Sequence, residues 1–149
     1  KVSSTLNICS IDLLTRTIVI ARNNPAPVII AQNGNVHPFD DESNPVGLYR
    51  NTRPRIIEMA LEIGVSVFLF SDGLVHAGSR SGISMNIPQV IQDLLQHPNY
   101  TTQNLADKLL NQAIELDQGR PCDDISVVVV QVLSLQGDQT RRMLVRLPI

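Results

Sequence analysis

The sequence predicts an α+β domain in which antiparallel strands pack with helices. The first third of the chain alternates β-rich runs with short turns, and residues 87–116 contain two segments with the periodicity of amphipathic helices. A run of four valines at 127–130 indicates one more buried strand, covered on both faces. With 149 residues, 43% of them hydrophobic, the chain is long enough for one core, so residues 1–149 are expected to form a single domain.

The N-terminal third is expected to start with an antiparallel hairpin. Residues 4–14 and 17–23 are rich in β-formers, and residues 14–16 supply a short turn between them. Pro25 and Pro27 interrupt the sheet, because proline cannot donate a hydrogen bond to a central ladder. The chain must therefore leave the sheet here before it pairs again.

One further strand and a long loop are expected after these prolines. Residues 28–31 can pair again, and Gln-Asn-Gly-Asn at 32–35 is a strong turn signal. Residues 36–53 are polar and contain Pro38 and Pro45, so they are expected to be a surface loop.

Residues 54–64 fit two structures, because their apolar positions match both a helical face and the alternation of a strand. The strand is favoured, since the apolar run 65–70 follows at once and a reversal at 62–64 would pair the two. Helices are expected at 87–96 and 101–116, packed against a sheet, and a last strand at 141–149.

Composition excludes several classes of function. The net charge is −2, only 3% of residues are aromatic and there is no Trp, so the chain lacks the basic stripe and the stacking platform of a nucleic-acid-binding protein. No apolar run approaches the roughly 20 residues of a membrane-spanning helix, and no signal region stands at the N-terminus. The chain is therefore expected to be cytoplasmic, with no nucleic-acid or membrane partner.

The two cysteines do not predict a metal site or a disulfide. Cys9 and Cys122 lie far apart and lack the paired spacing of zinc ligands, so free thiols are expected. Two acids, Asp123 and Asp124, adjoin Cys122 and are expected to raise the pKa of its thiol, which would make it a poor nucleophile.

An acidic residue follows the apolar run at 65–70. Asp72 and Gly73 tolerate the backbone angles of a turn, so Asp72 is interpretable as a turn former or helix cap. Alternatively, Asp72 is a rigidly presented oxygen ligand, and Gly73 lets an ion and its waters approach the backbone. One acid does not decide between the two interpretations.

A second acidic pair, Asp123 and Asp124, precedes the valine run. If that strand is the antiparallel neighbour of residues 65–70, the end of one lies beside the start of the other and the carboxylates converge at one sheet edge. Converging carboxylates repel, and a cation relieves the repulsion; all-oxygen ligands favour Mg²⁺, Mn²⁺ or Ca²⁺ over zinc. Acidic turns at strand ends are also common without a metal, so both possibilities stay open.

Taken in order, these motifs resemble the metal-dependent PPM-type phosphatases (protein phosphatase 2C), in particular the bacterial branch of stage II sporulation protein E. Ser-Asp-Gly at 71–73 and Asp-Asp-Ile at 123–125 look like the family's two metal-binding motifs, and helices are expected between them in both. The N-terminal hairpin with its proline-containing sequel and Asn-Pro-Val-Gly-Leu at 44–48 are similar to further family motifs. The resemblance covers residues 4–132.

The resemblance implies a β-sandwich flanked by helices and the hydrolysis of phosphoserine or phosphothreonine by a metal-activated water. It makes Asp72 and Asp123 metal ligands and Gly73 the residue at which the ion can approach the backbone closely. Asp124 would be either an alternative ligand or a residue that supports the ligands without touching the ion. It also implies two Mn²⁺ or Mg²⁺ ions, about 3.5–4 Å apart. No protein nucleophile is then needed, in agreement with the absence of a Gly-x-Ser-x-Gly elbow from the sequence.

The chain also departs from the family pattern. The family opens with a Gly-Asp strand whose aspartate bridges both metals, and this sequence has no counterpart, so the N-terminal part of the domain is expected to be missing and this chain alone to be inactive or nearly so. His76 stands where the branch usually has Glu, and Arg22 begins Arg-Asn-Asn-Pro where the branch has Asn-Ala-Gly-His. The alternative function is a non-catalytic, phosphatase-like binding module that lacks the bridging ligand.

The resemblance further implies partners. The substrate would be a phosphorylated protein such as an anti-anti-sigma factor, in bacterial stress or sporulation signalling, and a sensor domain would precede the phosphatase. Arg22 and Arg80 are candidates for phosphate contacts, because arginine pairs with phosphate in a two-pronged way, although most surface arginines are merely solvated. Residues 78–82 are expected to form a loop, which could face the substrate.

Overall fold

The computed structural model describes residues 2–97 and 100–134, which form seven strands and three α-helices. The strands are β1 (Leu6–Asp12), β2 (Thr17–Asn23), β3 (Val28–Gln32), β4 (Asn35–Phe39), β5 (Arg55–Ala60), β6 (Ser66–Phe70) and β7 (Val127–Gln131). The helices are α1 (Asp72–His76), α2 (Ile87–Leu95) and α3 (Thr102–Leu116), and a 3-10 turn, η1 (Ser79–Ser81), follows α1.

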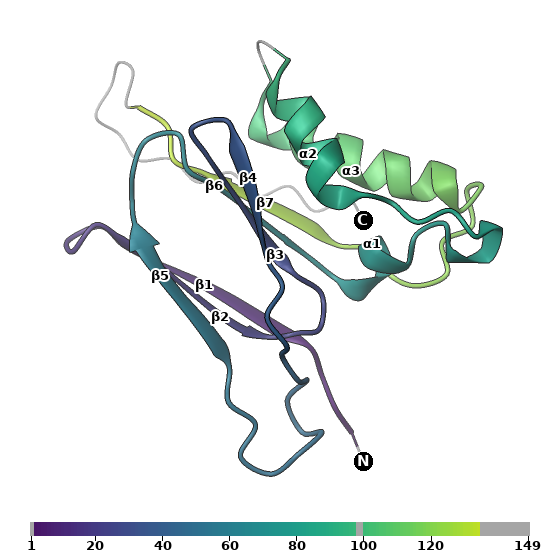
Figure 1. The fold of residues 1–149 in the computed structure, drawn as a ribbon, viewed down its shortest axis with the longest axis horizontal. Helices are drawn as coiled ribbons and strands as arrows, with labels where there is room; N and C mark the ends of the chain where they lie inside the picture. The colour runs from purple at the N-terminus through teal and green to yellow at the C-terminus, as the bar shows by residue number, and fades with distance from the viewer. Residues whose placement is uncertain (1, 98–99, 135–149) are drawn as a thin grey trace, which may run out of the picture.

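The strands form two antiparallel sheets, and helices cover one of them (Figure 1). The first sheet has the order β1-β2-β5 and the second the order β4-β3-β6-β7. Figure 1 shows three layers: the first sheet, the second sheet, and the pair α2 and α3 on its outer face. This arrangement confirms the expected α+β sandwich flanked by helices. None of the helices in the described residues has the length and apolarity needed to cross a lipid bilayer.

The two central strands of the second sheet supply two cores. Side chains alternate between the faces of a strand, so Ile29, Phe68 and Phe70 face the helices while Ile30 and Val67 face the first sheet. The helix-side core also includes Leu74, Ile91, Leu105 and Leu109, and the sheet-side core includes Ile18, Ile20, Val28, Val65 and Leu69. Burial on both faces fixes β6 in the middle of its sheet, which determines where its C-terminal end lies.

The N-terminal hairpin is confirmed. Strands β1 and β2 pair from Leu6 opposite Asn23 to Asp12 opposite Thr17. In the turn, Asp12 Oδ1 accepts hydrogen bonds from the amides of Leu14 and Thr15 at 2.7 and 3.1 Å. The amides of Thr15 and Leu14 lower the pKa of Asp12, because they stabilise the carboxylate.

The expected loop at 36–53 begins with a strand instead. Strand β4 continues the turn at 32–35 and pairs with β3, with Pro38 opposite Ile29. Proline is tolerated here because β4 is an edge strand, so its missing N–H removes no bond to a second neighbour.

The expected pairing of residues 54–64 with 65–70 is wrong, although the strand itself is confirmed. Strand β5 pairs with β2, with Ile57 opposite Ile20, and the chain then crosses to the other sheet. Alternate positions of β5 are exposed, as suits an edge strand, whereas every residue of β6 is buried and needs a neighbour on each side.

The valine strand β7 is confirmed in position but not in burial. It lies at the edge of the second sheet, where α3 packs on it, and Val128 is 54% exposed. The run of β-branched residues therefore predicted more burial than β7 has, because an edge strand keeps one side open to solvent. The strand expected at 141–149 lies outside the described residues.

Candidate functional site

The pairing of β6 with β7 brings the two acidic segments to the same edge of one sheet. The ladder ends with Phe70 opposite Val127, and the Ser71 amide then donates to the Ser126 carbonyl at 3.1 Å. Because the strands are antiparallel, the residues after Ser71 lie beside the residues before Ser126. Asp72 leaves the edge on one strand, and Asp123 and Asp124 enter it on the other.

The Ser71 side chain hydrogen-bonds to the backbone of the second acidic segment at this edge. Its hydroxyl donates to the Asp124 carbonyl at 2.9 Å and accepts from the Ser126 amide at 3.0 Å. The same residue is the N-cap of α1, and its carbonyl accepts from the Leu74 amide at 3.2 Å. The serine of Ser-Asp-Gly therefore fixes both acidic segments relative to each other, a role that the sequence analysis did not assign.

Gly73 permits a close backbone contact at the same place. A Cβ at this position would lie 2.4 Å from the Asp124 carbonyl oxygen and 3.0 Å from its carbon. Such distances are closer than van der Waals contact allows, so only glycine lets the first turn of α1 lie against the second acidic segment. Asp72 is thus the first residue of a helix rather than part of an open turn.

The second acidic segment is exposed. Asp123 Oδ1 accepts from the Asp124 amide at 2.8 Å, which holds the Asp123 carboxylate close to its own backbone. The carboxylate side chains at this edge offer only oxygen atoms as ligands. Mg²⁺ and Mn²⁺ prefer oxygen ligands, and in that respect the residues fit the expected ions. However, within residues 2–97 and 100–134 no group of three or more His, Cys, Asp or Glu side chains is arranged to hold an ion. The described residues thus bring two acidic segments to one edge without forming a complete set of metal ligands.

Asp117, at the end of α3, also connects the two segments. Its side chain is 8% exposed; Oδ1 accepts from the Gly78 amide at 2.9 Å and Oδ2 from the Cys122 amide at 3.4 Å. Gly78 follows α1 and Cys122 precedes Asp123, so one carboxylate ties together the loops on both sides of the edge. This role could not be predicted from the sequence, because an acid after a helical stripe is ordinarily a solvated C-cap.

Arg22 is not available for a phosphate contact. It is fully buried, and its guanidinium donates to the carbonyls of Asn24, Ala26 and Asp41 and lies 5.2 Å from the centre of the Phe39 ring. Burial lowers the pKa of Arg22, and the nearby Asp41 opposes that effect. The residue fixes the 39–44 segment against β2, which is a structural role.

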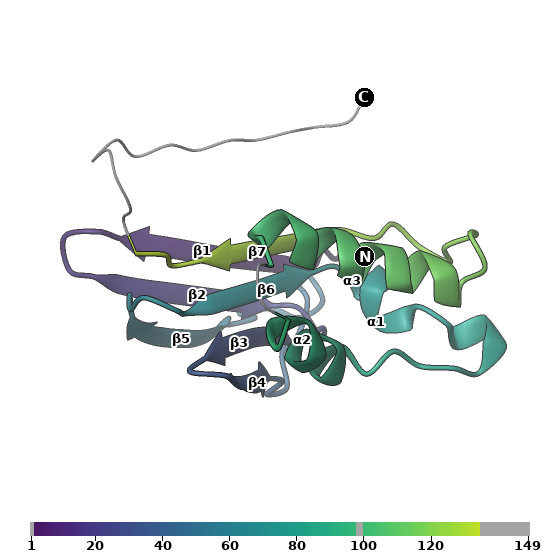
Figure 2. The ribbon, with the colours of Figure 1, turned by 90° about the horizontal axis from the view of Figure 1, so that it is seen from above.

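A groove of about 440 Å³ lies between the sheets beside the acidic edge, lined by Asn7 and Cys9 of β1 and by Ser71 and Ser126 among others. The side-chain oxygen of Asn7 is buried there without a partner among the described residues. Cys9 and Cys122 are both free, as expected, and burial raises the pKa of the Cys9 thiol. Strands β1 and β7 belong to different sheets, and residues of both line the groove. Figure 2 looks onto these layers and shows the two strands overlapping.

Comparisons with known proteins show which family and which folds the chain resembles. A family model described as stage II sporulation protein E (SpoIIE) matches residues 2–133. No curated protein sequence matches the chain.

Solved structures share the fold. The phosphatase domain of the cell fate determinant SpoIIE from Bacillus subtilis, presoaked with Mn, is 19% identical with a TM-score of 0.70, covering 91% of this chain and 59% of that one. The RsbU and RsbW domains of a Mycobacterium tuberculosis protein are 13% identical with a TM-score of 0.68, covering 89% of this chain and 37% of that one.

A third structure is the catalytic domain of the serine/threonine protein phosphatase PstP in complex with two manganese ions. It is 17% identical with a TM-score of 0.67, covering 89% of this chain and 60% of that one. This chain therefore spans about three fifths of the length of the SpoIIE and PstP domains that it matches.

Proposed function

Because this chain belongs to the stage II sporulation protein E family, we propose that it is part of a metal-dependent serine/threonine protein phosphatase. The family match supports the reaction class, and one feature of the structure supports the position of the site. That feature is the Ser71 hydroxyl, which bridges the Asp124 carbonyl and the Ser126 amide and so holds two acidic segments at one sheet edge.

We assign Asp72 and Asp123 as metal ligands, with Asp124 as an alternative ligand, on this basis. Mn²⁺ or Mg²⁺, when bound, would supply the activated water that hydrolyses a phosphoserine or phosphothreonine ester. The chain's own contribution is to fix the ligand positions. Ser71 sets the separation of the two segments, Gly73 allows their close approach, and Asp117 holds the loops that follow and precede them.

A non-catalytic binding module is the second candidate. The observation in its favour is that the described residues contain no group of three or more potential metal ligands. Two carboxylates from opposite segments would hold an ion weakly, since hard cations take six or more oxygen ligands. We expect the enzyme's remaining ligands to come from outside the described residues.

The partners follow from the same proposal. The substrate would be a phosphorylated protein, such as an anti-anti-sigma factor, in the cytoplasm of a bacterium that uses the phosphatase in stress or sporulation signalling. A sensor domain upstream would control it. These assignments rest on the resemblance to the family and on no contact within the chain.

Mn²⁺ titration by calorimetry tests the metal-site assignment. The parent chain should bind Mn²⁺, and Asp72→Asn or Asp123→Asn should weaken binding at least about tenfold, because each removes a charged ligand. Asp107→Asn, on the exposed surface of α3, is the control and should bind like the parent. Equal Mn²⁺ affinity for parent and Asp72→Asn would exclude this edge as the metal site.

Turnover measured on the same samples shows whether this chain alone is sufficient for catalysis. Because the part of the chain that the structure describes contains no group of three or more potential metal ligands, this chain alone should hydrolyse an aryl phosphate slowly or not at all, even in millimolar Mn²⁺. Rapid turnover that depends on Mn²⁺ would show that the chain already contains a complete site, and it would exclude the non-catalytic module.

A further inference from the structure

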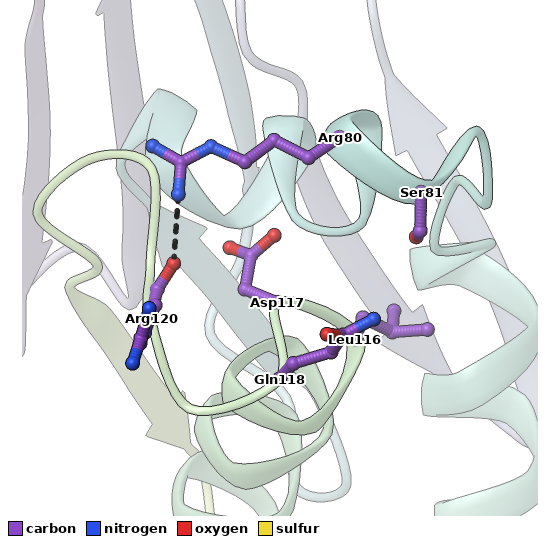
Figure 3. Close-up of a pocket in the computed structure, with 6 residues that line it drawn as sticks. All are labelled: Arg80, Ser81, Leu116, Asp117, Gln118 and Arg120. Atoms are coloured by element: carbon purple, nitrogen blue, oxygen red, sulfur yellow. Dashed lines mark hydrogen bonds between the residues drawn. The ribbon is translucent and has the colours of Figure 1, made fainter.

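A cavity of about 460 Å³ lies where η1 meets the end of α3 and the loop that follows it (Figure 3). Six residues from two loops line it: Arg80, Ser81, Leu116, Asp117, Gln118 and Arg120. Arg80 and Ser81 belong to η1, which follows α1, and the other four belong to the end of α3 and the loop leading to β7.

Two arginines bring positive charge to this cavity. Arg80 Nη1 donates to the Arg120 carbonyl at 3.4 Å, and Figure 3 shows the Arg80 side chain extended across the cavity towards that carbonyl. Among residues 2–97 and 100–134, neither guanidinium has a carboxylate oxygen within the 4.0 Å of an ion pair. Both arginines thus line the cavity, and neither is neutralised by a direct ion pair within the described residues.

The acid in the cavity does not cancel both charges. Asp117 lies beneath Arg80, and its two oxygens already accept from the backbone amides of Gly78 and Cys122. One carboxylate against two guanidiniums leaves an excess of one positive charge among the lining side chains. The bonds made by Asp117 also fix the two loops against each other, so the cavity walls are tied together.

The same two loops carry the proposed metal ligands. Arg80 stands eight residues after Asp72, beyond the short helix α1, and Arg120 stands three residues before Asp123. Asp117 of the cavity accepts from the amides of Gly78 and Cys122, so an anion in the cavity would lie on the side of the acidic edge that carries α1 and the loop between α3 and β7.

We propose that the Arg80–Arg120 cavity binds an oxyanion carried by a peptide, either the carboxylate of an acidic side chain or a phosphate. A guanidinium pairs through two N–H groups with two oxygens of either group, and the side-chain amide of Gln118 adds a neutral donor. The assignment of this peptide as a substrate rests on the proposed phosphatase function. The cavity would then select substrates that carry an anion near the phosphorylated residue. The binding itself needs no metal.

Amide chemical shifts of the 149-residue chain, measured by NMR in EDTA, test this proposal. Three matched peptides serve as probes: one with a phosphoserine, one with glutamate at that position and acidic neighbours, and one neutral. The charged peptides should shift the amides of Gly78, Ser81, Gln118 and Arg120, and the neutral peptide should not. Binding by both charged peptides identifies a general oxyanion site, and binding by the phosphopeptide alone identifies a phosphate site.

Substitutions locate the site. Arg80→Met and Arg120→Met should each weaken binding about tenfold, as expected when a hydrogen bond to a charged group is lost, and 0.5 M salt should weaken it further. Arg50→Met is the control, since Arg50 is exposed and lines a separate hollow with Arg53 and Arg55. Both target arginines are exposed, so the fold should persist, which the parent-like spectrum of each variant would show.

The proposal is overturned if the charged peptides shift no amide of the cavity, or if Arg80→Met and Arg120→Met bind like the parent. It is also overturned if Arg50→Met weakens binding as much as they do. None of these outcomes depends on Mn²⁺, so the failure of the cavity and the failure of the metal site are distinguishable.

Discussion

Substitution of Asp72 distinguishes a role as metal ligand from a purely structural role as the first residue of α1. Replacement by Asn should change the metal-free free energy of unfolding by no more than about 1 kcal/mol, because relief of repulsion from Asp123 and Asp124 offsets the lost interaction with the N-terminus of α1. The same replacement should abolish the rise in melting temperature that Mn²⁺ gives the parent. Melting curves of both proteins, with and without Mn²⁺, make the measurement. A variant that keeps the full Mn²⁺ response would leave Asp72 a structural role only.

The hydrogen bonds of Asp12 should make the stability of the fold depend on pH, whether or not a metal is bound. The amides of Thr15 and Leu14 lower its pKa in the folded chain, so these bonds stabilise the fold above the unfolded pKa of about 3.9 and the gain is lost as the pH falls through the lower folded value. Asp12→Asn keeps an acceptor for the turn but does not titrate. The stability advantage of the parent over Asp12→Asn should therefore shrink as the pH is lowered from about 6 to about 3. Urea unfolding across this range checks it, and parallel pH profiles for the two proteins would count against it.

The residues at the acidic edge were predictable to different degrees. Asp72, Gly73, Asp123 and Asp124 stood out because acids and a glycine at the ends of apolar runs break the pattern of buried strands. Asp117 did not, because its partners, two backbone amides, leave no mark in the sequence. The burial of Arg22 could not be predicted from the sequence either, since the groups that accept from its guanidinium are backbone carbonyls of loops.

At the scale of elements, Gly73 decides how closely α1 approaches the segment before β7. Alanine within a helix normally stabilises relative to glycine by about 1 kcal/mol. Here the added Cβ would lie 2.4 Å from the Asp124 carbonyl oxygen, so Gly73→Ala should instead destabilise the fold by about 1–3 kcal/mol. Chemical denaturation of parent and variant gives the sign directly. A more stable Gly73→Ala would mean that α1 does not pack against Asp124 as the structure places it.

The elements themselves were largely predictable, whereas their partners were not. Periodicity and turn residues located the N-terminal hairpin, both long helices and the strands β3, β5 and β6. Pairing failed at β5 because a strand next in sequence is only the commonest neighbour, and here burial of β6 on both faces placed it between β3 and β7. Strand β4 was missed because Pro38 argues against a strand unless the strand is known to lie at an edge.

At the scale of the whole molecule, the order of the motifs carried more information than any one of them. The antiparallel pairing of β6 and β7, assumed from the sequence and confirmed by the register from Ser66 opposite Gln131 to Phe70 opposite Val127, is what turns two separate acidic turns into one edge. The sandwich and its outer helix layer then match phosphatase domains over about nine tenths of this chain. The metal site at this edge stays a prediction, because residues 2–97 and 100–134 contain no group of three or more potential metal ligands.

Anomalous X-ray diffraction from crystals soaked in MnCl₂ would locate Mn²⁺ and so decide whether this edge is the metal site. We expect an anomalous peak at the edge formed by the ends of β6 and β7, with carboxylate oxygens of both Asp72 and Asp123 within about 2.0–2.6 Å of one ion, the range of oxygen ligands to hard cations. A peak elsewhere on the molecule, or one that contacts neither aspartate, would contradict it.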